Sequence, residues 1–131
     1  MMRQLVAAAA MGLGLLATSA NAATPNISGD WQIQGEIQSG GAIVSATPTC
    51  TFVQTAAGNL SGSCVGPNAS GPLTGHISGT RVAWTWRNVP TTSIGINGET
   101  GFNGTYVDAH LIRGTMTSTA VRGSGTFTQT R

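Results

Sequence analysis

The feature that most constrains the fold of this chain is a two-residue alternation of apolar and polar side chains. In residues 31–38 (WQIQGEIQ), Trp31, Ile33 and Ile37 fall on one face, and the glutamines and the glutamate fall on the other. Because successive side chains of a β-strand point to opposite faces, this pattern predicts a strand with one buried face. The same alternation returns in residues 73–79, 81–88 and 101–106.

Short connections rich in turn-forming residues separate these segments. Glycine, asparagine and serine occupy residues 39–41, 58–59, 78–79, 97–98 and position 123. Residues of this kind at these intervals are typical of β-hairpins, and no segment after residue 22 shows a helical period. We therefore expect an all-β fold, a single antiparallel up-and-down meander of about eight strands that closes into a barrel, since closure removes exposed strand edges.

Residues 1–22 match a secretory signal peptide. Arg3 precedes an apolar run over residues 5–17, and residues 20–22 (ANA) fit the small-x-small pattern of a cleavage site. We expect cleavage after Ala22, a single barrel domain over residues 23–131, and a periplasmic or extracellular location. The apolar run is short for a bilayer span and no other run approaches ~20 apolar residues, so no membrane span is expected.

The two cysteines lie in a segment with the pattern of a single hairpin, residues 50–64 (CTFVQTAAGNLSGSC). Folding this segment about Ala57 places Cys50 opposite Cys64, with a three-residue loop that has glycine where a left-handed backbone is needed. Counting outward from the loop makes the cysteines a non-hydrogen-bonded pair, whose close approach suits a disulfide. Secreted chains with two cysteines use them this way more often than as metal ligands or reactive thiols, and we predict a Cys50–Cys64 disulfide.

Charged residues are few and scattered. The chain has six basic residues, all of them arginine, against four acidic residues. Nucleic-acid binding needs clustered basic residues that displace counterions from phosphates, and this chain has no such cluster. We therefore expect no nucleic-acid partner.

The best candidate for catalysis is Asp108 with His110, two positions apart in residues 106–111 (YVDAHL). A carboxylate beside an imidazole is half of a hydrolase triad or of a metal site. A pair at a hairpin tip is more often a turn aspartate and an exposed histidine, because aspartate is a common turn former. His76 is expected to point outward, and no spacing of His, Cys, Asp and Glu matches a zinc or calcium site. We expect no enzymatic activity, no metal and no cofactor.

The two ends of the barrel segment resemble the calycins, which include lipocalins, fatty-acid-binding proteins and avidins. Residues 28–33 (SGDWQI) place a Gly-x-Trp motif at the start of the first strand, and residues 123–131 (GSGTFTQTR) end with an arginine just beyond the last strand. In those barrels the first-strand tryptophan packs at one end, and a basic residue of the last strand lies across it. The resemblance implies that Trp31 and Arg131 form a structural pair held by cation–π attraction.

Within the calycins, the layout resembles most closely the avidin and streptavidin group. Three segments are similar to strands of that group, namely residues 81–88 (RVAWTWRN), 102–106 (FNGTY) and 125–128 (GTFT). The interior tryptophan of the group would correspond to Trp84 or Trp86. The biotin-ligand set is incomplete, because residues 108–116 (DAHLIRGTM) lack a further stacking tryptophan and Gly125 stands where the group has an aspartate. The resemblance therefore implies the architecture rather than biotin recognition.

Trp84 and Trp86 share the inward face of their expected strand. An eight-stranded barrel is just wide enough to be filled by side chains or to hold one small ligand, so these indoles either complete the core or line a pocket. Few other large residues are available to fill the lumen, and glycines at inner positions leave volume that neighbours, water or a ligand must occupy. The predicted ligand-binding residues are Trp84, Trp86, Tyr106 and Phe52.

Three functional hypotheses remain open. The first, favoured by the avidin-like layout, is a non-enzymatic barrel that binds a small neutral ligand in its lumen. The second is a solid barrel whose rim loop, residues 88–99, contacts a protein partner, as small protease and lysozyme inhibitors resembling this barrel class do. The third is an assembly protein whose exposed Ser-rich and Thr-rich strands pair with copies of the same chain.

Overall fold

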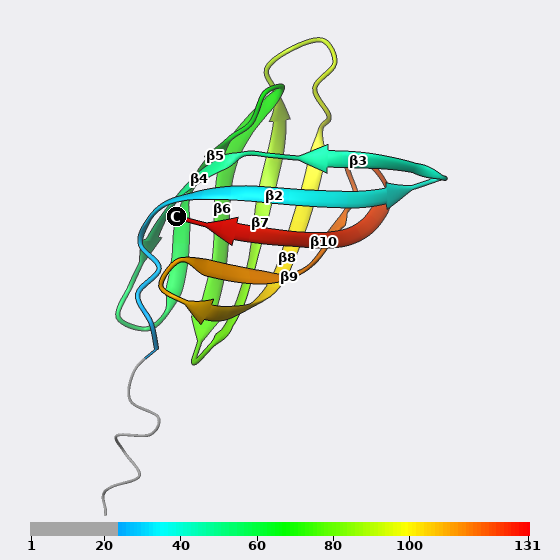
Figure 1. Ribbon diagram of the computed structural model, residues 1–131. Helices are drawn as coiled ribbons and strands as arrows, with labels where there is room; N and C mark the ends of the chain where they lie inside the picture. Colours follow the sequence, from blue (N-terminus) through cyan, green and yellow to red (C-terminus); the bar gives the residue numbers. More distant parts are fainter. Residues whose placement is uncertain (1–23) are drawn as a thin grey trace, which may run out of the picture.

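Nine β-strands make up the fold of residues 24–131, arranged as Figure 1 shows. The computed structural model describes residues 24–131, so the predicted signal peptide, residues 1–22, lies outside the described residues. The strands are β2 (Gly29–Ser39), β3 (Ala42–Ala46), β4 (Thr49–Gln54), β5 (Asn59–Val65), β6 (Ala69–Ser78), β7 (Arg81–Pro90), β8 (Gly98–Asp108), β9 (Leu111–Ser118) and β10 (Gly123–Thr130). Residues 24–131 contain no helix that is long and apolar enough to cross a membrane.

The strands form a closed antiparallel barrel. From β4 to β10 each strand pairs with the next, and β2 pairs with both β4 and β10. The barrel wall therefore has eight strands, β2 and β4–β10, in up-and-down order. This arrangement confirms the predicted all-β meander barrel.

A ninth strand, β3, extends the wall at one end of the barrel. β4 pairs with residues 29–32 in the first half of β2, whereas β3 pairs with residues 35–39 in the second half. Thr47 and Pro48 separate β3 from β4. Because proline has no backbone N–H, the hydrogen-bond ladder is interrupted there. Among the described strands, β3 has no partner besides β2.

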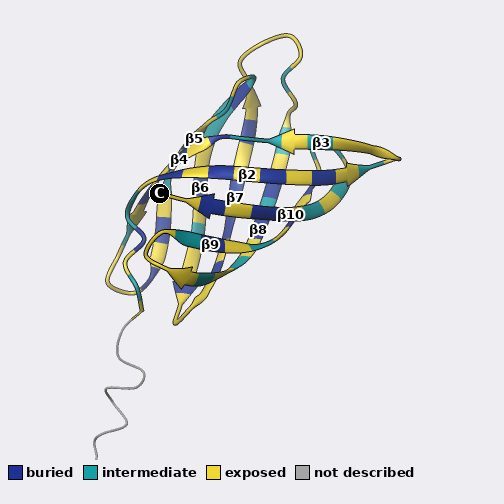
Figure 2. Cartoon of the chain, viewed as in Figure 1, coloured by how far each residue is buried: buried dark blue, intermediate teal, exposed yellow. Residues whose placement is uncertain are grey.

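The alternation along each strand places every second side chain inside the barrel. In β2, Trp31, Ile33 and Ile37 are buried, and the residues next to them are exposed. Buried and exposed residues alternate along the strand in Figure 2. β7 buries Trp84 and Trp86 in the same way. Most of the inward side chains form one continuous apolar core, as the two-residue period predicts.

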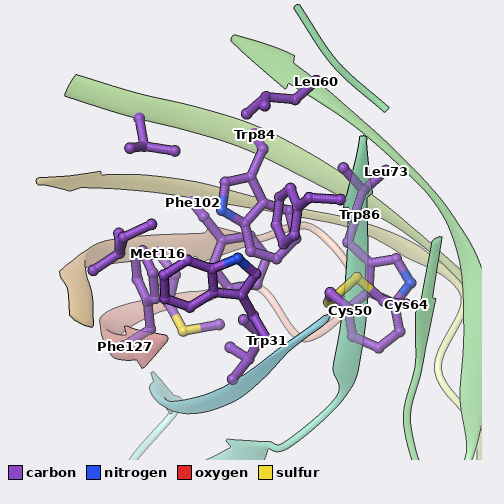
Figure 3. Packing of buried hydrophobic residues seen from close by; sticks show 14 of the residues in the cluster. Trp31, Cys50, Leu60, Cys64, Leu73, Trp84, Trp86, Phe102, Met116 and Phe127 are labelled. Atoms are coloured by element: carbon purple, nitrogen blue, oxygen red, sulfur yellow. A yellow bond between two sulfur atoms is a disulfide. The ribbon is translucent and has the colours of Figure 1, made fainter. Parts of the chain in front are cut away.

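Aromatic side chains fill the middle of the barrel. Trp84 is stacked on Phe102, with ring centroids 3.9 Å apart (Figure 3). Phe52 meets Trp84 edge-on at 5.0 Å, and Phe127 meets Phe102 edge-on at 5.1 Å. A Cβ atom at Gly35 would lie only 2.5 Å from Sδ of Met116. The volume left by this inner glycine is thus taken up by a neighbouring side chain.

The predicted disulfide is present between β4 and β5. Cys50 lies opposite Cys64, and the two sulfur atoms are bonded at 2.06 Å. The hairpin has the predicted register, with Phe52 opposite Gly62, and Gly58 in its loop has a φ of 89°. A disulfide indicates a non-reducing compartment.

Arg131 and Trp31 meet at the end of the barrel where β2 begins and β10 ends. The guanidinium carbon of Arg131 lies 4.2 Å from the centroid of the Trp31 ring. Its Nη1 donates to the carbonyl oxygen of Ser28 at 2.9 Å, and its Nε donates to that of Ala109 at 2.8 Å. The indole Nε1 of Trp31 donates to the carbonyl oxygen of Ile27 at 2.9 Å. The last residue of the chain is therefore tied to the segment before β2 and to the β8–β9 turn.

Candidate functional site

A cavity of about 220 Å³ lies at the other end of the barrel, where β2 and β7 end and β8 begins. We refer to it as the mouth cavity. Most of its lining is apolar, with uncharged polar side chains interspersed, and it includes Ile37, Val44, Ala46, Pro48, Ala69, Ile94, Ile96, Val121, Trp86, Asn68, Asn88, Thr100 and Ser118. No Asp, Glu, Lys, Arg or His from residues 24–131 lines it. The mouth cavity therefore offers a ligand apolar surface and hydrogen-bonding groups without a formal charge.

Trp86 separates the mouth cavity from the core. It is 3% exposed, belongs to the buried core and also lines the cavity. Gly66 keeps the space beside the indole clear, because a Cβ atom at this position would lie 3.4 Å from Cη2 of Trp86. The Nε1 of Trp86 is buried and has no hydrogen-bond partner within the described part of the chain. The indole thus gives the cavity an apolar wall and carries an unused donor.

Three buried polar side chains meet at inner positions of β7, β8 and β9. Asn88, Thr100 and Ser118 are 8%, 3% and 6% exposed. The Thr100 hydroxyl donates to Oδ1 of Asn88 at 2.9 Å, and its oxygen lies 3.2 Å from Oγ of Ser118. Strand register brings them together, because Thr100 is opposite Trp86 in β7 and opposite Ser118 in β9. They place uncharged hydrogen-bonding groups in a mostly apolar surrounding.

The β7–β8 loop, residues 91–97, forms part of the rim. It projects beyond the ends of the two strands that it joins (Figure 1). The Thr92 hydroxyl donates to Oδ1 of Asn68 at 3.0 Å, which ties the loop to the β5–β6 turn. Ile94 and Ile96 line the cavity, yet they are 74% and 39% exposed. The rim therefore presents apolar side chains to solvent.

The four predicted ligand-binding residues do not form one surface. Of the four, only Trp86 lines the mouth cavity. Trp84 and Phe52 contact each other in the core and are 2% and 1% exposed. Tyr106 is partly buried near the end of β8, toward the end of the barrel that holds Arg131. The middle of the lumen, where the sequence suggested a ligand, holds packed aromatic rings.

Sequence reasoning did not single out Asn88, Thr100 or Ser118. A signal existed for Asn88, which follows Trp84 and Trp86 at the next inward position of β7. A polar side chain on a buried face is costly unless it has partners, so it points to a local polar cluster or a site. Thr100 and Ser118 carry no comparable signal, because the chain is rich in threonine and serine throughout.

A wider hollow of about 720 Å³ lies on the outer wall of the barrel. Its lining includes outward-facing side chains of β2, β8, β9 and β10, among them the exposed Glu36, Thr105, Arg113 and Thr126. A small molecule there would remain in contact with water over much of its surface. The hollow thus lacks the buried lining that characterises small-molecule sites.

Asp108 and His110 belong to the turn between β8 and β9. Oδ1 of Asp108 accepts the backbone N–H of His110 at 2.8 Å, and Nδ1 of His110 lies 3.2 Å from the backbone oxygen of Arg131. Both residues are exposed, and these bonds are those of a hairpin turn. Within residues 24–131, no group of three or more His, Cys, Asp and Glu side chains lies close enough together to hold a metal ion.

Comparison with protein-family models, curated proteins and solved structures finds no match to this chain. The proposed function therefore rests on the residues of this chain alone. Among the sites in residues 24–131 considered above, the mouth cavity is the one that combines a buried aromatic wall, buried polar groups and a solvent-exposed rim.

Proposed function

We propose that this protein is a non-enzymatic, secreted or periplasmic barrel that binds a small neutral molecule in its mouth cavity. The cavity volume of about 220 Å³ is below the range of roughly 300–1,000 Å³ that is typical of sites for drug-sized ligands, which suits a smaller molecule. The uncharged lining suits a neutral molecule, because moving an ion from water into a mostly apolar site without a counter-charge is costly.

The observation that carries the proposal is the buried polar group formed by Asn88, Thr100 and Ser118. If this end of the barrel served only to complete the core, apolar side chains at these positions would give nearly the same stability, because buried hydrogen bonds add little net free energy to folding. Small-molecule sites instead hold a few positioned polar groups in an apolar surrounding, where they orient the ligand. The mouth cavity has this composition.

The proposed site lies beyond the aromatic core rather than within it. Trp84 is stacked on Phe102, and this contact leaves the middle of the lumen filled. Trp86 borders both the core and the cavity, so it is the tryptophan that a ligand would contact. In this proposal Trp84, Phe52 and Tyr106 support the barrel, and Trp86 remains a ligand-binding residue.

Isothermal titration calorimetry of the purified protein with its disulfide intact tests the proposal. The titrants are small neutral ketones, lactams, alcohols and hydrocarbons. We expect saturable binding that weakens about fivefold in Trp86→Phe, because the smaller ring removes part of the apolar contact. The matched variant Trp84→Phe, which changes an indole in the core, should retain the wild-type affinity. Saturable binding of none of these compounds to the wild type would contradict the proposal.

A second candidate function is recognition of a protein partner by the rim loop, residues 88–99. The observation that favours it is that Ile94 and Ile96, which are 74% and 39% exposed, place two apolar side chains on one loop. Inhibition of purified secreted proteases or lysozymes that is lost in Ile94→Ser would support this function. Inhibition that Ile94→Ser leaves unchanged would exclude the loop tip as the contact.

A further inference from the structure

Two asparagines at the mouth cavity have their side-chain oxygens engaged by threonines. Oδ1 of Asn88 accepts the Thr100 hydroxyl at 2.9 Å, and Oδ1 of Asn68 accepts the Thr92 hydroxyl at 3.0 Å. Both asparagines line the cavity. A side-chain amide consists of one acceptor oxygen and an NH₂ group with two donors. No described residue accepts a hydrogen bond from either NH₂ group, so each NH₂ group can donate to another partner.

A chain of hydroxyl groups adjoins the side-chain oxygen of Asn88. The backbone N–H of Ala120 donates to Oγ of Ser118 at 3.1 Å, and Oγ of Ser118 lies 3.2 Å from Oγ1 of Thr100. A hydroxyl has a single proton, and Thr100 donates its own to Oδ1 of Asn88, so Ser118 is the donor in its contact with Thr100; the backbone oxygen of Glu99 is a second acceptor for the Ser118 hydroxyl, at 3.4 Å. The chain therefore runs from a backbone amide through two hydroxyls to the Asn88 oxygen, and each bond in such a chain polarises the next.

The NH₂ groups of Asn68 and Asn88 are the side-chain donors of the mouth cavity for which no described residue supplies an acceptor. Nε1 of Trp86 also has no partner among the described residues, but this atom is fully buried, as is the unpaired Nε1 of Trp84 in the core, so it is not counted among the donors that face the cavity. No Asp or Glu from residues 24–131 lines the cavity to balance them, and most of the remaining lining is apolar. A ligand that supplies an acceptor oxygen to these NH₂ groups gains a hydrogen bond, whereas a ligand without an acceptor displaces water from them and leaves them unpaired.

On the basis of the function proposed above, we propose that the ligand is a neutral molecule with a carbonyl-type acceptor oxygen, such as a ketone, a lactone or an amide. The oxygen accepts a hydrogen bond from Nδ2 of Asn88, and the apolar part of the ligand packs against Trp86, Ile94 and Ile96. A protonated amine finds no carboxylate in this lining, and a carboxylate finds no cation. A hydrocarbon leaves the asparagine donors unpaired.

Two probes of nearly identical shape test this inference, cyclohexanone and methylenecyclohexane, in which C=CH₂ replaces C=O. Dissociation constants are measured for the wild type, for Asn88→Ala and for the matched control Asn103→Ala, whose side chain is exposed on the outer wall. The ratio of the two constants is compared between proteins, because hydration of the free probes cancels in that comparison. We expect Asn88→Ala to shift the ratio about fivefold against cyclohexanone, the effect of one neutral hydrogen bond, and Asn103→Ala to leave it unchanged.

The outcomes separate this inference from the proposed function. If both probes bind and Asn88→Ala leaves the ratio unchanged, the inference is wrong and the proposed function stands. If neither probe binds the wild type but an alcohol or a hydrocarbon of the larger set does, the inference is wrong and the proposed function stands; if no compound of that set binds, both are wrong. If Asn88→Ala does not fold, the inference is tested on the wild type instead, by following the side-chain NH₂ resonances of Asn88 during titration with each probe. A downfield proton shift with cyclohexanone alone supports the inference, and equal shifts with both probes overturn it.

Discussion

The indole of Trp84 lies flat on the ring of Phe102, with centroids 3.9 Å apart and planes 9° from parallel. Phe52 and Phe127 contact this pair edge-on, at 5.0 and 5.1 Å, so aromatic rings fill the middle of the barrel. Trp86, two positions further along β7, borders the mouth cavity instead. Two tryptophans that share one face of one strand therefore have different roles.

Replacing Trp84 with alanine is expected to lower the free energy of unfolding by about 3–5 kcal/mol, because the variant leaves a void among packed rings. Trp86→Ala should cost less, because one side of that indole already borders a cavity and makes fewer contacts there. Urea unfolding followed by far-UV circular dichroism measures both values. A smaller loss for Trp84→Ala than for Trp86→Ala would contradict the assignment of Trp84 to the core.

Removing the disulfide by the double substitution Cys50→Ala and Cys64→Ala should lower the free energy of unfolding by about 3 kcal/mol, because the unfolded chain regains the freedom that the link removes. Alanine is chosen because both cysteines are fully buried and serine would bury unpaired hydroxyls. Urea unfolding with and without reductant provides the measurement. Reductant should move the wild-type midpoint toward that of the double variant and leave the variant unchanged. A fully reduced wild type with an unaltered midpoint would refute this prediction.

Arg131→Ala is expected to lower the free energy of unfolding by about 1–2 kcal/mol, since it removes the cation–π contact with Trp31 and the hydrogen bonds to Ser28 and Ala109. Arg131→Lys should restore only part of the loss, because an ammonium group lacks the planar guanidinium that makes these contacts together. Arg113→Ala, on the outer wall, is the control and should change stability by less than about 0.5 kcal/mol. Equal effects of the two alanine variants would argue against a structural role for Arg131.

Export should yield a mature chain that begins at Ala23, because residues 20–22 form the expected cleavage site. Mass spectrometry of the protein produced from its full sequence in a bacterial host, after separation of the periplasmic fraction, measures the mature mass. A chain that keeps residues 1–22 and stays with the cytoplasmic fraction would contradict the predicted signal peptide.

Much of the barrel could be predicted from the sequence because strong local patterns encode it. The two-residue period placed Trp31 and Trp84 on inward faces, and the symmetry of the hairpin about Ala57 paired Cys50 with Cys64. The short strand β3, which precedes β4, was not predicted. β3 pairs with the second half of β2 and β4 with the first half, with Pro48 between them. This pairing is set by contacts between strands, which the pattern within a single strand does not show.

The candidate site could be predicted only in part. Trp84 and Trp86 are equivalent in the local sequence, and what distinguishes them is that Phe102 stacks on Trp84 from another strand. Thr100 contacts Asn88, and Ser118 contacts Thr100. The register of β7, β8 and β9 brings these residues together, and the spacing of polar residues in the sequence does not predict that register.

The indole N–H resonances of the three tryptophans give the most direct test of the mouth cavity as a ligand site. Trp31, Trp84 and Trp86 each contribute one signal to a ¹H–¹⁵N spectrum, and single Trp→Phe substitutions assign them. On titration with cyclohexanone, the Trp86 signal should move saturably, and the Trp31 and Trp84 signals should stay in place. Saturable movement of the Trp84 signal with the Trp86 signal unchanged, or no saturable movement of any signal, would contradict the proposal.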